Sequence, residues 1–149
     1  MGYQDNQVYR GGTIMTNDQF QMTNKLPITN AKHGKFDIYD RCMSFALRAA
    51  KLVDIIPRKP SLIEYGKQLI RSSASIGANM EEADGALTKK DFVNKVGIAR
   101  REAKESNYWL KLIEQTIPNQ FQELDILLRE SKEIKLILSS IINKTRGIA

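Results

Sequence analysis

The amino-acid sequence predicts an all-α protein folded as an antiparallel up-down-up-down four-helix bundle. From residue 36 onward, apolar residues recur at alternating spacings of four and three, which marks one face of a helix. Prolines and helix-capping residues divide this part of the 149-residue chain into four segments of roughly 20–28 residues each. Only a few residues separate consecutive segments, and such short connections place neighbouring helices antiparallel. We therefore expect residues 36–149 to form one bundle.

Residues 1–35 are expected to form a polar tail that is flexible or loosely docked. This segment contains the stretches GG and TNKLPITN, has few large apolar residues and lacks helical periodicity. We find no strand-like alternation in the chain. The scattered apolar residues of the tail are candidates for docking on a partner subunit. They are Ile14, Met15, Phe20, Met22, Leu26 and Ile28.

The first two helices are predicted at about residues 37–56 and 60–84. Pro57 stops the first helix, and Pro60 suits the first position of the second, where its missing N–H has no intrahelical acceptor. Gly85 fits a C-terminal cap. The predicted core stripes are Ile38, Cys42, Phe45, Ala49, Leu52 and Ile56, then Leu62, Gly66, Leu69, Ser73, Ile76, Met80 and Ala83.

The third and fourth helices are predicted at about residues 88–117 and 120–146. The stretch TKKD at residues 88–91 resembles a capping box, and NQFQ at residues 119–122 offers a second capping arrangement. Pro118 ends the third helix. The predicted core stripes are Phe92, Val96, Ala99, Ala103, Ser106, Leu110, Ile113 and Ile117, then Leu124, Leu127, Ser131, Ile134, Leu138, Ile141 and Thr145.

The composition argues against an enzyme. The chain has one cysteine, Cys42, and one histidine, His33, and the two lie in different kinds of segment. A Cys-rich zinc site and an internal disulfide are therefore excluded, and Cys42 reads as a buried thiol on an apolar helix face. We expect no catalytic residues, no metal and no cofactor. The chain also lacks a signal segment and a bilayer-spanning apolar run, so a cytoplasmic location without a membrane partner is expected.

The stretch SASIGANMEEADG, at residues 73–85, combines small residues with clustered acids. Small residues in a helix favour the close approach of a neighbouring backbone, because glycine and serine otherwise weaken the helix. We expect Asn79, Glu82 and Glu105 to form a buried polar network, since polar groups inside a bundle need hydrogen-bond partners. A solvated face is the alternative, above all for Glu81 and Asp84.

Apolar residues outside the main stripes predict a homo-oligomer. The third helix carries several such residues, and the fourth carries more, so that one bundle does not cover all of them. The adjacent rings of Tyr108 and Trp109 suggest base stacking as another possibility. Adjacent residues on a helix point about 100° apart, however, so the two rings cannot share one face, and an interface or core role is favoured for Trp109. The candidate interface residues are Tyr108, Trp109 and Leu112.

The net charge of +6 makes an anionic partner plausible. Cations recur at near-helical spacing along the third helix, and phosphate contacts need only such a stripe. The alternative is a solvated, salt-bridged surface, because Glu102, Glu105 and Glu114 interleave with these cations. The candidate nucleic-acid-binding residues are Arg58, Lys59, Lys67, Arg71, Lys89, Lys90, Arg100, Arg101, Lys104 and Lys111.

Two long stretches, residues 65–85 and 88–113, together resemble the four-helix-bundle family of 23S ribosomal RNA intervening-sequence proteins. The resemblance covers about residues 36–146, and the tail lies outside it. Ala83 stands where many members have glycine, and Gly77 where many have proline. The residues that carry the resemblance are Tyr65, Gly66, Arg71, Ser75, Ile76, Asn79, Glu82, Ala83, Lys90, Asp91, Phe92, Glu105, Tyr108, Trp109 and Leu110.

The resemblance implies a bacterial protein of unassigned biochemical role that forms ring-shaped homopentamers. A distant relative, the accessory protein of diversity-generating retroelements, is similar in fold, basic and pentameric, and partners a reverse transcriptase and nucleic acid. We therefore expect a non-catalytic, oligomeric interaction or assembly module that binds RNA, an RNA-containing complex or a nucleic-acid-processing protein. The alternative is a structural scaffold or protein-partner adaptor without affinity for nucleic acid.

Overall fold

The computed structural model describes residues 7–10, 13–16, 37–118 and 121–148. The chain divides into two units, residues 1–37 and residues 38–149. The first unit contains β1 (Gln7–Arg10) and β2 (Thr13–Thr16), which pair antiparallel with Gln7 opposite Thr16 and Arg10 opposite Thr13. The expectation that the chain has no strands is therefore wrong for this hairpin. The predicted flexibility and docking of the tail concern mostly residues outside the described ranges.

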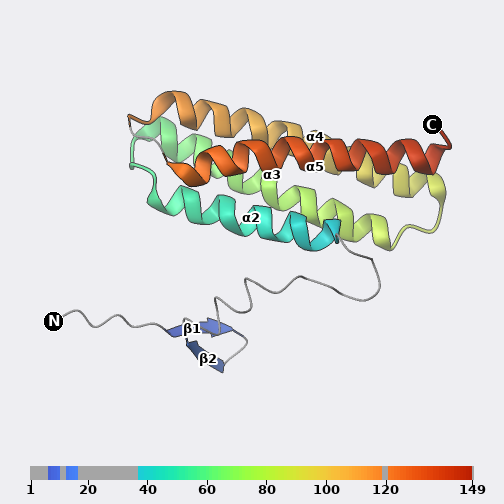
Figure 1. Cartoon of the computed structure of the whole chain (residues 1–149), viewed down its shortest axis with the longest axis horizontal. Helices are drawn as coiled ribbons and strands as arrows, with labels where there is room; N and C mark the ends of the chain where they lie inside the picture. Colours follow the sequence, from blue (N-terminus) through green and yellow to red (C-terminus); the bar gives the residue numbers. More distant parts are fainter. Residues whose placement is uncertain (1–6, 11–12, 17–36, 119–120, 149) are drawn as a thin grey trace. The chain divides into compact units, whose positions relative to one another are not determined.

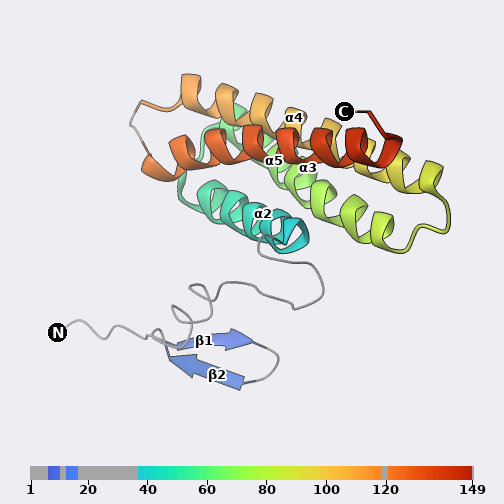
Figure 2. The same cartoon turned by 45° about the vertical axis from the view of Figure 1, so that its right-hand side comes forward.

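The second unit is built from four helices. They are α2 (Ile38–Ile55), α3 (Pro60–Asp84), α4 (Lys89–Thr116) and α5 (Gln122–Arg146), coloured from cyan to red in Figure 1. Each helix packs against two others, since α2 contacts α3 and α5 while α4 also contacts α3 and α5. Figure 2 shows α2 beside α3 and α4 beside α5. The prediction of four helices in a bundle is confirmed; the boundaries of α3 agree with the prediction, and those of the other helices differ by one or two residues.

The helix termini follow local sequence rules. Thr88 is the N-cap of α4, and its Oγ1 accepts a hydrogen bond from the Asp91 N–H at 3.1 Å, as the TKKD stretch predicts. Ile117 is extended because Pro118 follows it, and α4 ends there. The second predicted cap is wrong: Phe121 is the N-cap of α5 and makes no side-chain capping bond. Gly85 caps α3 with a negative φ of −85°, so it does not use the left-handed conformation.

The core lies between the four helices and consists almost entirely of the predicted stripes. Cys42, Phe45, Leu69, Ile113 and Leu138 are among its fully buried side chains. Two positions differ by one residue. Val93 and Ile142 are buried, whereas their predicted neighbours Phe92 and Ile141 are only partly buried. A helix of 3.6 residues per turn drifts against a strict seven-residue repeat, which moves the buried line to the adjacent residue near helix ends.

Small residues on α3 allow two close helix contacts. A Cβ added at Gly66 would lie 2.8 Å from Val53 Cγ1, so only glycine fits against α2 there. On the other flank, the buried hydroxyls of Ser72 and Ser106 join α3 to α4 by a hydrogen bond of 2.8 Å. Within the predicted stretch at residues 73–85, Ser73 is buried and a Cβ added at Gly77 would lie 3.8 Å from Cys42 Cβ, whereas Ala74 and Ala78 are exposed.

Candidate functional site

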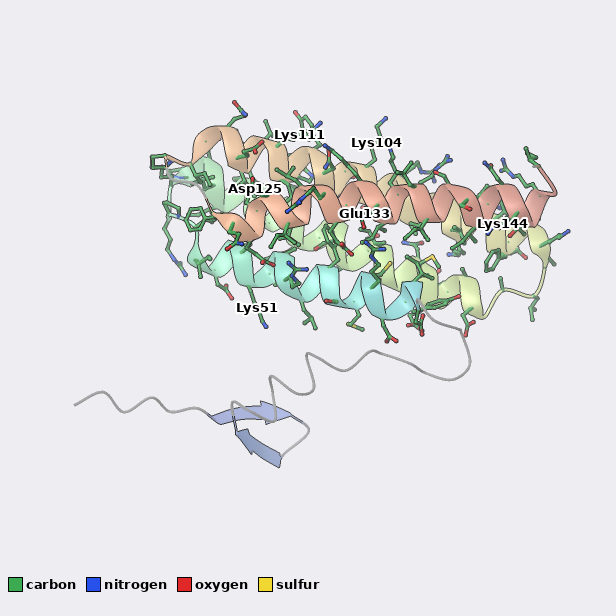
Figure 3. The ribbon with its side chains drawn as sticks, viewed as in Figure 1. Lys51, Lys104, Lys111, Asp125, Glu133 and Lys144 are labelled. Carbon is green, nitrogen blue, oxygen red and sulfur yellow. The ribbon has the colours of Figure 1, made fainter. Side chains whose placement is uncertain are left out.

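The outward face of α4 carries four exposed cations, Arg100, Arg101, Lys104 and Lys111. Arg100, Lys104 and Lys111 are four and seven residues apart and lie on one side of the helix, and the side chain of Arg101 points about 100° away from that of Arg100, at the edge of this side. Figure 3 shows Lys104 and Lys111 pointing away from the bundle. Among the described residues, no carboxylate lies within ion-pair distance of these four side chains. We refer to the four residues as the α4 cation row.

Two acidic residues of α4 point toward α3 instead of toward the cation row. Arg71 of α3 forms an ion pair with Glu105, and its Nη1 lies 3.7 Å from Glu102 Oε2. The alternative prediction from the sequence was a salt-bridged surface, in which the acids of α4 form ion pairs with cations one turn away on the same helix. For Glu102 and Glu105 this alternative is wrong, because both lie on the flank of α4 that packs against α3. These two carboxylates therefore do not pair with the α4 cation row.

Glu102 is the more buried of the two acids, with 17% of its side chain exposed. Its Oε2 is buried and has no hydrogen-bond partner among the described residues. Burial raises the pKa of Glu102 above its ordinary value, and the negative charge of Glu105 adds to this effect. Arg71 and Arg101 act in the opposite direction. The negatively charged form of Glu102 is therefore destabilised by its position between α3 and α4.

The aromatic residues of the same flank form a cluster around Trp109. The Trp109 ring stacks on Tyr65 of α3, with ring centroids 6.2 Å apart and planes inclined by 29°. Its Nε1 donates a hydrogen bond of 3.1 Å to Glu105 Oε1, the same carboxylate that pairs with Arg71. Four residues that carry the family resemblance, Tyr65, Arg71, Glu105 and Trp109, therefore meet although they come from two helices. We refer to them as the Trp109 cluster.

The three predicted interface residues have different environments. Trp109 is half-buried in its cluster, and Leu112 is also half-buried. Tyr108 is 55% exposed and meets Trp109 edge-on at 5.3 Å between ring centroids. Because Tyr108 follows Lys104 by four residues and precedes Lys111 by three, it lies on the same side of α4 as the cation row. An exposed aromatic ring thus stands among unpaired cations.

The other predicted basic residues are less concentrated. Lys67 pairs with Glu64 at 2.8 Å, and Arg71 belongs to the Trp109 cluster. Lys89 and Lys90 are exposed at the start of α4, and Arg58 and Lys59 are exposed in the connection between α2 and α3.

Ion pairs also join α2 to α5. Arg41 contacts Glu130 at 2.5 Å and Glu133, and Arg48 contacts Glu123 at 2.6 Å. The hydrogen bond to Glu130 raises the pKa of Arg41 above its ordinary value. Cations that lie between helices are therefore paired, in contrast to the α4 cation row.

The predicted buried network of Asn79, Glu82 and Glu105 does not form within the chain. Asn79 is half-buried and donates hydrogen bonds to the Ser75 carbonyl oxygen at 2.8 Å and to Ser75 Oγ at 3.1 Å. Glu82 is 57% exposed and pairs with Lys95 of α4. Glu105 bonds to Trp109 and Arg71 instead. The prediction fails because Glu82 is exposed beside Lys95, and Glu105 lies beside Arg71, which is eight residues before Asn79 on α3.

Two further observations bear on the kind of site. In the part of the chain that the structure describes, no group of three or more His, Cys, Asp and Glu side chains is placed to hold a metal ion. Within the same described ranges, no helix has both the length and the apolar character needed to cross a bilayer.

The chain matches a protein family and is similar to solved structures. A family model described as 23S rRNA-intervening sequence protein matches residues 34–140. The chain is also similar to a crystal structure from Bacteroides thetaiotaomicron, described as a protein with unknown function from the S23 ribosomal protein family. The two share 35% sequence identity with a TM-score of 0.62, covering 71% of this chain and 98% of that chain. No curated protein matches the chain. Neither matching description names a catalytic activity.

Proposed function

Because the chain belongs to the 23S rRNA-intervening sequence protein family, we propose that it is a non-catalytic, oligomeric module that binds RNA through the outward face of α4. The observation that carries the proposal is the α4 cation row, Arg100, Arg101, Lys104 and Lys111, which has no carboxylate partner among the described residues. Cations of this kind attract phosphates and release the counterions condensed on them. We also propose a cytoplasmic location for this role.

Tyr108 gives the same face a second means of binding single-stranded RNA. Its ring is 55% exposed and lies between Lys104 and Lys111 along the helix. Stacking of a base on an aromatic ring contributes about 1–3 kcal/mol and tolerates any base. Cations that hold the backbone and a ring that holds a base are the two components of sequence-tolerant binding to single strands.

We further propose that the helices run up-down-up-down and that the bundle assembles into a ring-like homo-oligomer, with a pentamer favoured by the family resemblance. The end of α2 and the start of α3 lie at the same end of the bundle as the end of α4 and the start of α5 (Figure 1). Exposed aliphatic side chains support assembly. Met43 and Leu47 are each 57% exposed on α2, and Ile63 and Ile70 are exposed on α3.

Three of these side chains are close in sequence to residues that lie at the contact between α2 and α3. Ile63 and Ile70 lie three residues before and four residues after Gly66, which contacts Val53 of α2. Met43 follows Cys42, the residue nearest to Gly77 of α3. Burial of apolar area stabilises association by about 25 cal/mol per Å². A second copy of the chain is the proposed occupant, and the face lies on helices other than α4, so both activities can coexist.

The alternative function is a scaffold or protein-partner adaptor without affinity for RNA. The same apolar side chains of α2 and α3 favour it, because they would suit a protein partner as well as a second copy. The two functions differ in one respect that can be measured: an adaptor does not depend on the α4 cation row.

The test compares two doubly substituted chains that lose the same charge. Lys104→Gln/Lys111→Gln removes half of the α4 cation row, and Lys51→Gln/Lys95→Gln removes two cations from other surfaces. Figure 3 shows Lys51 on α2, on the opposite side of the bundle from Lys104 and Lys111. Lys95 is paired with Glu82. The measurement is the affinity for a labelled single-stranded RNA at fixed salt.

We expect the first double variant to bind at least tenfold more weakly than the second. The slope of log affinity against log salt should become less negative by about 1.4, which is two contacts at about 0.7 each for single strands. Equal affinities of the two double variants would reject the outward face of α4 as the binding surface. Recovery of a protein partner after nuclease treatment, with no RNA affinity, would favour the adaptor.

A further inference from the structure

A hollow of about 360 Å³ lies on the surface between α4 and α5. Its lining includes Asn94, Gly97, Arg100 and Arg101 from α4, and Ile142 and Arg146 from α5. Residues 94, 97 and 101 lie at helical spacing on α4, and residues 142 and 146 lie one turn apart on α5. The two helices therefore bring three guanidinium groups to one concave place, and no acidic residue is part of its lining.

The charge of the hollow is not balanced within the described chain. Arg100, Arg101 and Arg146 are exposed, and none of them lies within ion-pair distance of a described carboxylate. Three like charges in one hollow repel one another unless an anion lies between them. Guanidinium groups suit a phosphate best, since their planar donors can bind two of its oxygens at once.

Gly97 provides an independent observation. It lies inside a 28-residue helix, where glycine is less favourable than alanine. A Cβ added at Gly97 would meet nothing within 4 Å, in contrast to Gly66, where it would meet Val53 at 2.8 Å. Packing within the chain thus explains Gly66 and does not explain Gly97. Glycine on a binding surface allows a ligand to approach the backbone closely.

We propose that the hollow is a phosphate subsite, in which Arg100, Arg101 and Arg146 hold one phosphate group of an RNA backbone over Gly97. This inference rests on the proposed function and extends it, since it adds Arg146 and Gly97 to the binding surface and fixes one phosphate to a defined place. The volume is within the range of small-ligand pockets, about 300–1,000 Å³. Asn94 adds a polar side chain at the rim.

The test uses the full chain and a labelled single-stranded RNA. Two substitutions probe the hollow in different ways. Arg146→Gln removes a cation from α5, and Gly97→Leu fills the hollow without a change of charge. Ser140→Leu is the control for Gly97→Leu, because Ser140 is exposed on α5 and does not line the hollow. Circular dichroism confirms that each variant is folded.

Arg146→Gln and Gly97→Leu should each weaken RNA binding about three- to tenfold, while Ser140→Leu binds as the unsubstituted chain does. Arg146→Gln should also make the salt slope less negative, by less than the about 0.7 of a whole phosphate contact, because Arg100 and Arg101 remain on the same phosphate. Inorganic phosphate should compete with RNA for the unsubstituted chain and compete less for Gly97→Leu.

Three results would overturn the inference in distinguishable ways. If the chain binds RNA and both hollow variants bind as Ser140→Leu does, the hollow holds no backbone phosphate, while the proposed function stands. If the unsubstituted chain binds no RNA at about 50 mM salt, where phosphate contacts are strong, the proposed function and the inference both fail. Phosphate that binds the hollow without competing with RNA would indicate a free anion as its ligand and would also reject the inference.

Discussion

Alanine substitutions at Gly66 and Gly97 should change stability in opposite directions. Both residues lie inside long helices, Gly66 in α3 and Gly97 in α4. Alanine is about 1 kcal/mol more favourable than glycine inside a helix, and this gain applies to both positions. The surroundings decide the sign, because the new methyl group meets open space at Gly97 and Val53 of α2 at Gly66.

The atoms near each added Cβ determine how large the change in stability is. At Gly97 nothing lies within 4 Å of the added Cβ, so Gly97→Ala should stabilise the fold by about 0.5–1 kcal/mol. At Gly66 the added Cβ lies 2.8 Å from Val53 Cγ1 and 3.4 Å from Val53 Cγ2. Overpacking of this kind costs about 1–3 kcal/mol. After the helix gain of about 1 kcal/mol is subtracted, Gly66→Ala should destabilise by up to about 2 kcal/mol.

Urea unfolding followed by circular dichroism measures both effects. In thermal unfolding of a domain of this size, 1 kcal/mol corresponds to a shift in melting temperature of roughly 4 °C, so the two variants should be clearly separated. Val53→Ala combined with Gly66→Ala should recover part of the loss, because the clash is removed. A Gly66→Ala chain as stable as the Gly97→Ala chain would refute the close contact between α2 and α3.

Three further outcomes are expected. Because the pKa of Glu102 is raised, the folded chain binds its proton more tightly than the unfolded chain, so stability should fall as pH rises above the ordinary glutamate pKa of about 4.5. Glu102→Gln should flatten this slope in pH-dependent urea unfolding, and an unchanged slope would contradict the assignment. Leu47→Glu should lower the mass measured by light scattering, since it places a charge on the proposed interface; an unchanged mass would remove α2 from that interface. Tyr108→Ala should weaken RNA binding while Tyr108→Phe retains it, and equal losses would exclude stacking.

The helices and the core were predictable because the signals that define them are local. Apolar residues at helical spacing define the stripes, and Pro57, Pro60 and Pro118 define the limits of helices. The hairpin had a local signal as well: two glycines separate QVYR from TIMT, which is a recognised hairpin pattern. The prediction of a polar tail relied on the composition of the whole segment and did not consider this signal.

The candidate site was only half predictable. The sequence gives the cations of α4 and their spacing, but not the direction in which each flank of α4 faces. Glu102 and Glu105 are near the cations in sequence and yet turn toward Arg71, which is 31 residues before Glu102. Arg146 was missed because it is far from the others in sequence, and only the packing of α5 on α4 brings it to the hollow.

The Trp109 cluster shows the same limit. Tyr65, Arg71, Glu105 and Trp109 were recognised as marks of the family, although no spacing rule connects residues of different helices. Their contacts depend on the register of α3 against α4, which the hydrogen bond between Ser72 and Ser106 helps to fix. A buried network around Glu82 was predicted instead, because clustered acids in a sequence do not reveal which of them face the core.

The salt dependence of RNA binding by the unsubstituted chain tests the central claim most directly. With Lys104 and Lys111 on one phosphate each and Arg100 and Arg101 together on a third, a plot of log affinity against log salt should be linear with a slope near −2, at about −0.7 per contact on a single strand. Light scattering on the same sample gives the number of chains in the binding unit. No binding at low salt, or binding whose affinity does not change with salt, would contradict the assignment of the α4 cation row as an RNA-binding surface.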